Sequence, residues 1–323
     1  MRWLIGALAA LGLMAGDGAA CAQDRTKLTI ATGVDPSFSA YYVALERGFF
    51  TQHGLDVTLN TGASGSAMVA FVIRDQVQSA FGAEQAGIQD FNLDSDVVVV
   101  AEGAQLLRWH GIVGRGLLTL DDLKGKRLGI APGTGSEEFW LAVVDVKQLR
   151  PADYVILNVE APEMIAGIER GDLDAYSAWE PWVTRGLHMV PDTRLLQGPE
   201  GILAHSVFIY MNRGWIVQNP AAAKEFLAAL VDASDFIASN PAAAADDVAK
   251  VLRLDRALTG ELMLKLSFEV RLVQASIDDL RRAEMQLKAL GKLAKPVDWR
   301  RFVHPDLLRA IRPDRVNFSL PPA

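Results

Sequence analysis

The sequence predicts an α/β protein of two lobes, each built on a mainly parallel sheet flanked by helices. Three observations lead to this prediction. From Lys27, short β-type runs alternate with amphipathic segments, which is the pattern of parallel sheets covered on both faces. The alternation restarts after Thr119, and from Pro220 the chain is almost wholly helical in pattern. Two α/β units with a restart between them indicate two lobes.

Residues 1–22 have the layout of a secretory signal peptide. Arg2 precedes an apolar run over 3–14, and small residues follow up to Ala22. The apolar run is shorter than the roughly 20 residues that span a bilayer. We therefore expect cleavage after Ala22 and a soluble periplasmic protein. Lipid attachment at Cys21 is the alternative, but Gly18 stands where a lipoprotein signal usually has an apolar residue.

Composition excludes several classes of function. Cys21 is the sole cysteine, so the mature chain is expected to have neither a disulfide nor a thiol nucleophile. The net charge is −7 and no basic block occurs, which is not the pattern of a nucleic-acid-binding protein. The pattern calls for no cofactor and no metal, and we expect a monomer with two cores of ordinary size.

The first α/β unit is expected between residues 28 and 100. Its β-type runs are short, and the later two are too apolar for a wet sheet edge. The strands are expected at 28–31, 55–59, 79–81 and 97–100, with helices at 39–47 and 66–74.

The second unit repeats the pattern, and a further β-type run returns the chain to the first lobe. The expected strands are 127–131, 154–158, 175–178 and 206–211, with helices at 137–148 and 163–170. Crossings near 112–118 and 203–212 predict a hinge of two strands. The first lobe would then hold residues 23–113 and 207–323, and the second lobe 114–206.

The C-terminal helices are expected to cover one lobe. Asn240 and Pro241 form a helix-start signal before an alanine-rich stretch, and this signal carries no function of its own. The Pro-rich tail after Arg312 is expected to fray.

Two loops of small residues mark the predicted ligand site. Ligands of open α/β sheets bind outside the carboxyl ends of the strands, and the loops 62–66 and 132–136 lie there, directly before helices. The N–H groups of a helix start attract anionic or polar groups. Thr134 and Glu137 also fit a capping box, which is the purely structural alternative. Neither loop has the spacing of a nucleotide phosphate loop.

Aromatic residues give a second indication of a pocket. In the segment 35–50, Pro36 predicts a turn, and helical spacing turns Tyr42 toward the core. This leaves Phe38 and Tyr41 to face a ligand.

The segment 172–182 gives a third indication. Trp179 and Trp182 flank an acid and a proline after a buried strand, and we expect Pro181 to stop any helix and hold a stiff loop. A tryptophan that fills the lobe core is the alternative for either position.

Three segments resemble a known family. They are "YYVALERGFFTQHGLDVTL", "LDDLKGKRLGIAPGTGS" and "AGIERGDLDAYSAWEPW", and they are similar to periplasmic binding proteins for sulfonates, taurine, nitrate and thiamine-type pyrimidines, the NMT1/THI5-like solute-binding proteins of ABC importers. The likeness runs from about Leu28 to Val251. It implies the two-lobed, type II-like periplasmic-binding-protein fold, closure over a small polar ligand, and delivery to an ATP-driven membrane permease.

The resemblance also implies a set of cleft positions, to which residue-level reasoning adds Tyr41 and Glu84. Glu84 departs from the family pattern, where a small or neutral residue is common. The positions carried over from the family are Pro36, Ser37, Phe38, Ser64, Gly65, Ser66, Gly133, Thr134, Gly135, Ser136, Trp179, Glu180 and Pro181.

Glu84 and Glu180 suggest the charge of the ligand. Both fall at predicted cleft loops, and no arginine is evident there. Because an unpaired buried carboxylate is costly, we hypothesise a ligand with a positive or donor-rich end, such as an aminosulfonate or an aminopyrimidine. The alternative is that both glutamates point to solvent at the lobe rims.

Two other functions remain open. Some enzymes of pyrimidine-precursor synthesis resemble these receptors, and His110 and His205 lie near the predicted crossings, where they could reach the cleft. Against an enzyme, the five histidines show no metal-binding spacing, and no G-x-S-x-G motif occurs. A sensor that docks on a signalling protein is the second alternative, and no residue pattern separates it from a transport protein.

Overall fold

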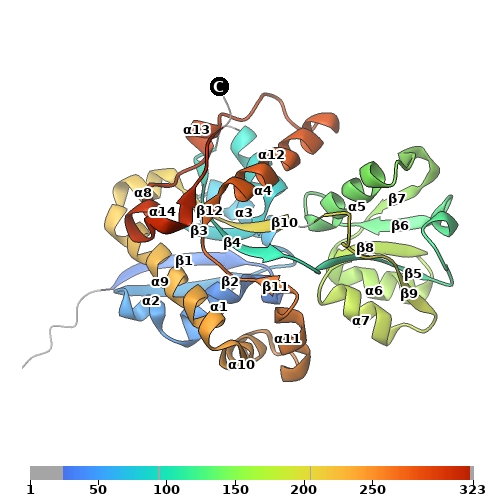
Figure 1. Cartoon of the computed structure of the whole chain (residues 1–323), viewed down its shortest axis with the longest axis horizontal. Helices are drawn as coiled ribbons and strands as arrows, with labels where there is room; N and C mark the ends of the chain where they lie inside the picture. The colour runs from blue at the N-terminus through green and yellow to red at the C-terminus, as the bar shows by residue number, and fades with distance from the viewer. Residues whose placement is uncertain (1–24, 94, 204, 321–323) are drawn as a thin grey trace, which may run out of the picture.

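The computed structural model describes residues 25–320 except 94 and 204; in this part of the chain it has two large sheets, each covered by helices, and a small two-stranded sheet (Figure 1). The predicted two-lobed α/β fold is confirmed. We call the six-stranded sheet with its helices the first lobe and the five-stranded sheet with its helices the second lobe. The expected signal peptide, with Cys21, lies outside the described residues.

The first sheet is mixed rather than mainly parallel. Its order is β11-β4-β10-β3-β1-β2. Strand β1 pairs in parallel with β2 and β3, whereas β10 lies antiparallel between β3 and β4. Every residue of β3 is buried, as a central strand requires. The strands are β1 (Thr26–Thr32), β2 (Leu55–Thr61), β3 (Ser79–Ala83), β4 (Val97–Leu106), β10 (His205–Asn212) and β11 (Leu266–Ser267).

The second sheet has the order β7-β6-β8-β5-β9. Strand β6 is parallel to β7 and β8, while β5 is antiparallel to β8 and β9. The sequence analysis missed β5, which contains two glycines, and β9, an edge strand without a buried residue. The strands are β5 (His110–Arg115), β6 (Arg127–Ile130), β7 (Val155–Asn158), β8 (Ala175–Trp179) and β9 (Thr193–Gln197).

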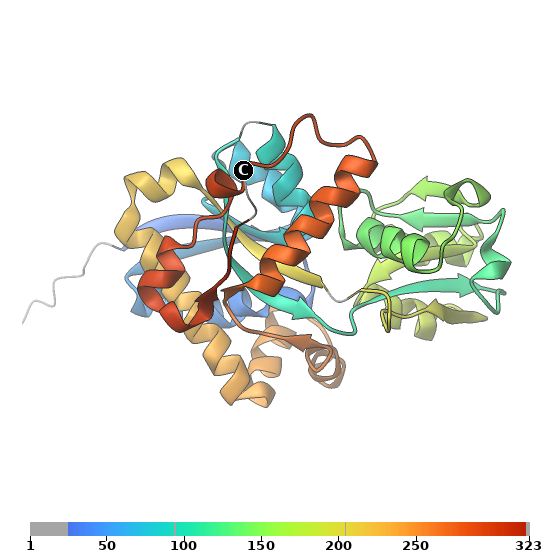
Figure 2. The same cartoon turned by 45° about the horizontal axis from the view of Figure 1, so that its top comes forward.

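The chain crosses between the lobes earlier than expected. Residues 107–109 join β4 to β5, because His110 already pairs with Trp179 of β8 in the second sheet. The return lies between Gln197 and His205 (Figure 2). The expected crossings were 112–118 and 203–212. We therefore propose to move the lobe boundaries, expected at 113/114 and 206/207, by a few residues toward the N-terminus.

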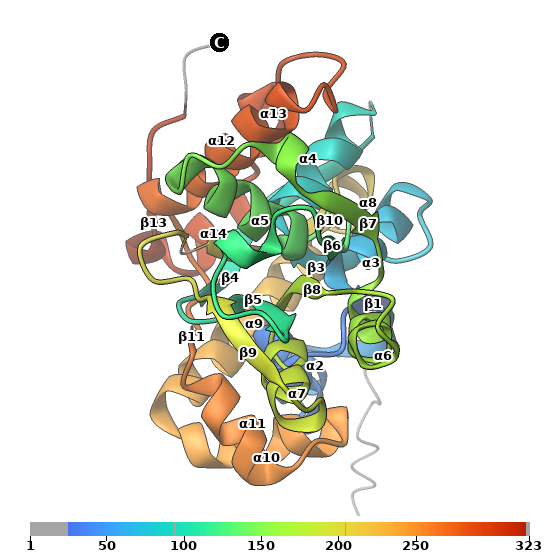
Figure 3. The same ribbon diagram turned by 90° about the vertical axis from the view of Figure 1, so that its right-hand side faces the viewer.

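Helices lie on both faces of each sheet. In the second lobe α5 covers one face, and α6 and α7 cover the other (Figures 1 and 3). The expected helices agree with the observed ones to within about two residues, but α2, α4 and α7 were missed. Pro181 does not hold a loop, because it is the N-cap of α7. A proline is tolerated at a helix start, since the backbone N–H that it lacks would have no partner within the helix there. These helices are α1 (Ser39–Glu46), α2 (Phe49–Gln52), α3 (Gly65–Ile73), α4 (Glu84–Asn92), α5 (Gly135–Val146), α6 (Ala161–Arg170) and α7 (Trp182–Met189).

The C-terminal segment packs on the first lobe, as expected. Phe226 of α9 contacts Tyr41 with ring centroids 5.9 Å apart. Helix α12 also contacts α5 of the second lobe. None of the described helices has the length and apolar character needed to cross a bilayer. The remaining elements are α8 (Arg213–Gln218), α9 (Pro220–Ser239), α10 (Pro241–Leu252), α11 (Arg256–Met263), β12 (Leu272–Val273), α12 (Gln274–Ala289), α13 (Trp299–Phe302), α14 (Asp306–Ile311) and β13 (Val316–Asn317).

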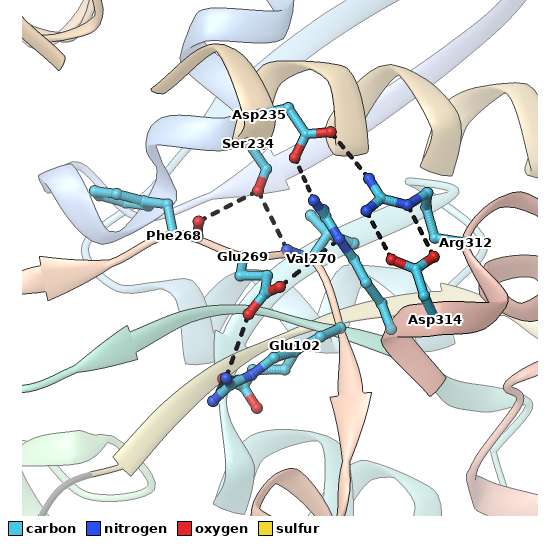
Figure 4. A network of polar contacts seen from close by, with 10 residues as sticks. Glu102, Ser234, Asp235, Phe268, Glu269, Val270, Arg312 and Asp314 are labelled. Carbon is cyan, nitrogen blue, oxygen red and sulfur yellow. Dashed lines mark hydrogen bonds and ion pairs between the residues drawn. The ribbon is translucent and has the colours of Figure 1, made fainter. Parts of the chain in front are cut away.

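The described part of the tail is pinned rather than frayed. Strand β13 pairs with β12, and Arg312 Nη1 lies 3.1 Å from Asp235 Oδ2 on α9. Arg315 also pairs with Asp235, and its Nε lies 3.7 Å from Glu269 Oε1 (Figure 4). These charged contacts tie the end of the chain to the first lobe.

Candidate functional site

A cavity lies between the two lobes, and the roughly 350 Å³ of space among its lining atoms includes open solvent. Both lobes and the first crossing contribute to its wall, as expected for open α/β sheets that bind ligands at the carboxyl ends of their strands. The lining residues are Asp35, Ser37, Phe38, Ser64, Gly65, Ser66, Ala83, Leu106, Trp109, His110, Thr134, Gly135, Trp179 and Val207.

The start of α3 forms one side of the cavity. Ser64 is the N-cap, and its Oγ accepts a hydrogen bond from Ala67 N at 3.1 Å. A Cβ atom on Gly65 would lie 2.3 Å from Phe81 O and 2.7 Å from the ring of Phe38, so only glycine fits. The first N–H groups of a helix have no partner within it, and here they belong to residues of the cavity wall.

The start of α5 contributes from the second lobe. Thr134 is the N-cap, but the expected capping box is shifted by one residue: Thr134 Oγ1 accepts from Ser136 N, and Glu137 Oε2 accepts from Gly133 N. Ser136 Oγ donates to Ser177 O at 2.6 Å and accepts from Ala131 N, so this hydroxyl has a structural role. Thr134 and Gly135 line the cavity, whereas Gly133 and Ser136 do not.

Asp35 is the acidic residue of the cavity wall, and the sequence analysis did not select it. Its Oδ1 accepts from Ser37 N at 2.9 Å and from Ser37 Oγ at 2.5 Å. Its Oδ2 accepts from Trp179 Nε1 of the second lobe at 3.0 Å. Burial raises the pKa of Asp35 to about 6, although these hydrogen bonds oppose the shift.

Of the two tyrosines considered for the site, neither lines the cavity. Tyr41 was expected to face the ligand, but it is fully buried, and its hydroxyl lies 2.7 Å from Ser79 Oγ. It packs against Phe81 and Phe226 because the C-terminal helix α9 covers this face of α1. Tyr42 is core, as expected, and donates to Gly33 O at 2.6 Å. Burial raises the pKa of both hydroxyls.

Aromatic walls come from both lobes and from the crossing. Phe38 lines the cavity, as expected, and meets Phe81 edge-on at 5.3 Å. Trp179 lines it from the end of β8, and Trp109 lines it from the crossing segment. The sequence analysis missed Trp109 and His110 as wall residues because it expected the crossing at 112–118. A crossing predicted at 107–109 would have indicated both. The His110 ring stacks on Phe139 at 5.6 Å.

Glu84 does not line the cavity, and it does not point to solvent either. It is fully buried at the start of α4, where its Oε1 accepts from Ser206 N at 2.9 Å. Burial raises the pKa of Asp279, and the nearby negative charge of Glu84 raises it further. The positive charge of Arg282 opposes this shift. Glu84 therefore belongs to a buried polar cluster that holds β10, the strand that returns from the second lobe.

Glu180 is likewise occupied by protein groups. It accepts from Thr184 N and Thr184 Oγ1, both at 2.9 Å, and Lys265 Nζ of the first lobe lies 2.6 Å from its Oε1. Glu180 and Lys265 border a second hollow rather than the cavity. The sequence placed Glu180 correctly at a strand end but could not show its partner, which lies 85 residues further along the chain.

The expected site residues thus separate into two groups. Ser37, Phe38, Ser64, Gly65, Ser66, Thr134, Gly135 and Trp179 lie together around the cavity, while Pro36, Tyr41, Glu84, Gly133, Ser136, Glu180 and Pro181 are not among its lining residues. The side chain of His205 is outside the described part. Within the described residues, no group of three or more His, Cys, Asp or Glu side chains could hold a metal ion.

Comparison with known proteins gives a family match over much of the chain. The model of the family described as "NMT1/THI5 like" matches residues 35–244. A binding protein of Brucella abortus (strain 2308) is 24% identical over 239 residues, which cover 70% of this chain and 74% of the relative.

Solved structures share the fold. The alkanesulfonate-binding protein SsuA from Xanthomonas axonopodis pv. citri, bound to MOPS, superposes with a TM-score of 0.77 at 19% identity, over 87% of this chain and 99% of that one. The desulfurization enzyme DSZB superposes with a TM-score of 0.69 at 18% identity, over 90% of this chain and 99% of the enzyme.

Proposed function

Because the chain belongs to the NMT1/THI5-like family, we propose that it is the extracytoplasmic substrate-binding protein of an ABC importer. It captures a small polar ligand between its lobes and presents it to a membrane permease. The observation that carries this proposal is the joint wall of the cavity, in which the starts of α3 and α5, one from each lobe, both take part. We propose that the protein acts as a periplasmic monomer after cleavage of residues 1–22.

The cavity wall favours a ligand with an anionic or strongly polar group. N–H groups at two helix starts attract negative charge, and the hydroxyl of Ser66 in the same wall adds a hydrogen-bond donor. Sulfonates fit this chemistry, and the structural relative SsuA is an alkanesulfonate-binding protein. Taurine, nitrate and the aminopyrimidines of thiamine synthesis remain candidates for this chain.

Closure follows from the size of such ligands. A ligand of about 7 heavy atoms can contribute at most about 10 kcal/mol, and micromolar binding already takes about 8 kcal/mol. Nearly every ligand atom must therefore be in contact with the protein. Two lobes that close over the ligand provide such contact, whereas an open groove does not.

A thermal-shift screen of sulfonates, amino acids, pyrimidines and inorganic anions tests this function. A ligand at 100 times its dissociation constant stabilises the folded protein by about 2.7 kcal/mol, so the midpoint of unfolding should rise by a few degrees. Small-angle scattering with the same compounds should show a change of shape. If no compound moves either signal, the proposal is wrong.

An enzyme on the same fold is the second candidate, because Asp35 and His110, two titratable groups, line one cavity. The structural similarity to the enzyme DSZB shows the fold alone. Incubation of the protein with each stabilising compound, followed by NMR of the small molecule, separates the two functions. A binding protein returns the compound unchanged, and an enzyme does not. A sensor would instead be identified by a growth assay in which uptake continues without the protein.

A further inference from the structure

Within the part of the chain that the structure describes, Asp35 is a buried carboxyl with no lysine or arginine beside it in the cavity wall. It is 4% exposed, and no lysine or arginine occurs among the described residues that line the cavity. Its hydrogen bonds come from Ser37 and Trp179, which are neutral donors. This differs from Glu180, which already has Lys265 as an ion-pair partner.

The carboxyl has room for a further donor. A carboxylate offers about four lone-pair sites, and only the Trp179 indole is bonded to Oδ2. An ionised carboxylate that is removed from water is costly unless it is paired and hydrogen-bonded. Among the described residues, no lysine or arginine of the cavity wall favours the charged form of Asp35, and His110 is the other titratable group of that wall.

Aromatic side chains around Asp35 suit the same kind of group. Phe38, Trp109 and Trp179 line the cavity with it. Aromatic faces attract lysine-like or quaternary ammonium cations within about 6 Å of the ring centroid. A carboxylate and aromatic rings in one small cavity are together the chemistry of an ammonium site.

We propose that the ligand is zwitterionic: its ammonium or other cationic N–H group binds Asp35, and its anionic group binds at the starts of α3 and α5. The inference rests on the proposed function and names the substrate class of the same cavity. It gives Asp35 the role that the sequence suggested for Glu84 or Glu180, both of which are satisfied by protein groups.

Matched pairs of sulfonates, with and without a cationic nitrogen, test this inference. Taurine and ethanesulfonate differ only in the ammonium group, and MOPS and 1-propanesulfonate differ only in the morpholine ring. Isothermal titration calorimetry at neutral pH would measure each dissociation constant. We expect wild-type protein to bind the amine-bearing member of at least one pair about tenfold or more tightly than its amine-free partner, as expected for a charge-assisted hydrogen bond.

Two variants identify the residue responsible. Asp35→Asn should bind both members of that pair with affinities within about threefold of each other. Asp56→Asn removes the same charge from an exposed position of β2 and should keep the wild-type preference. The wild-type comparison needs no variant, so it decides the matter even if Asp35→Asn fails to fold.

The outcomes separate this inference from the proposed function. Equal binding within both pairs by wild-type protein, or a preference that persists in Asp35→Asn, overturns the ammonium site and leaves the substrate-binding function in place. If none of the four sulfonates binds but another compound of the wider screen does, the inference of a zwitterionic sulfonate ligand is overturned. The substrate-binding function then stands on that other compound.

Discussion

Trp179 Nε1 donates a hydrogen bond to Asp35 Oδ2 over 3.0 Å, and this bond joins the two lobes across the cavity. Trp179 ends β8 in the second sheet, and Asp35 precedes the short helical turn Pro36–Phe38 that follows β1 in the first. Separation of the two lobes would break this bond. The proposed ligand site at Asp35 is therefore complete only when both lobes contribute to it.

Trp179→Phe should weaken ligand binding by about tenfold, because it keeps an aromatic wall but removes the donor to a charged acceptor. Calorimetry with the tightest ligand of the screen would measure the loss. Trp182→Phe, on a residue that does not line the cavity, is the control. Unchanged affinity in Trp179→Phe would mean that the indole bond contributes nothing to closure.

Asp35 should lower the stability of the ligand-free protein as the pH rises. Its pKa is raised from 3.8 to about 6 by burial, so between these values the unfolded chain loses the proton first and unfolding becomes easier. The resulting loss of unfolding free energy should be absent below about pH 4 and complete above about pH 6. Its full size should be on the order of 2–3 kcal/mol. Asp35→Asn removes it, so its free energy of unfolding should rise relative to wild type across this range. Urea unfolding at several pH values measures the difference, and a constant difference would contradict the prediction.

Lys265→Met should loosen the closed form. The side chain of Lys265 is 22% exposed and that of Glu180 only 4%, so the variant leaves a buried carboxyl with Thr184 alone. We expect a loss of roughly 1–3 kcal/mol in unfolding free energy, together with weaker ligand binding. The double variant Lys265→Met/Glu180→Gln removes both charges and should recover part of the loss. If the double variant is no better than the single one, the ion pair is not the cause.

Gly65→Ala should disrupt the start of α3. Its new Cβ would lie 2.3 Å from the backbone oxygen of Phe81, which cannot move as a flexible side chain would. We expect the free energy of unfolding to fall by about 1–3 kcal/mol, and we expect a loss of ligand affinity. Gly260→Ala on α11, where nothing lies within 4 Å of the new Cβ, should be neutral or slightly stabilising. Similar thermal midpoints for the two variants would refute the packing argument.

Local patterns in the sequence predicted eight of the strands, the small-residue loops and the starts of α1, α3, α5 and α6, but neither β5 and β9 nor α4 and α7. Ser64 and Thr134 are N-caps at the cavity, as their positions before helices indicated. What the sequence could not give were contacts between distant segments. Tyr41 is core because Phe226 covers it, and Glu180 is paired because Lys265 reaches it from the other lobe. Asp35 gained its importance from Trp179, a partner 144 residues away.

The insertion of β10 between β3 and β4 sets an order for folding during synthesis. The second sheet uses one continuous segment, residues 110–197, and can be completed as soon as that segment has emerged from the ribosome. The first sheet has a gap until residues 205–212 arrive, because β3 and β4 each pair with β10 and not with each other. Late pairing over such sequence distances is slow and leaves strand edges open. The nascent chain thus finishes its inserted lobe before the lobe in which it began.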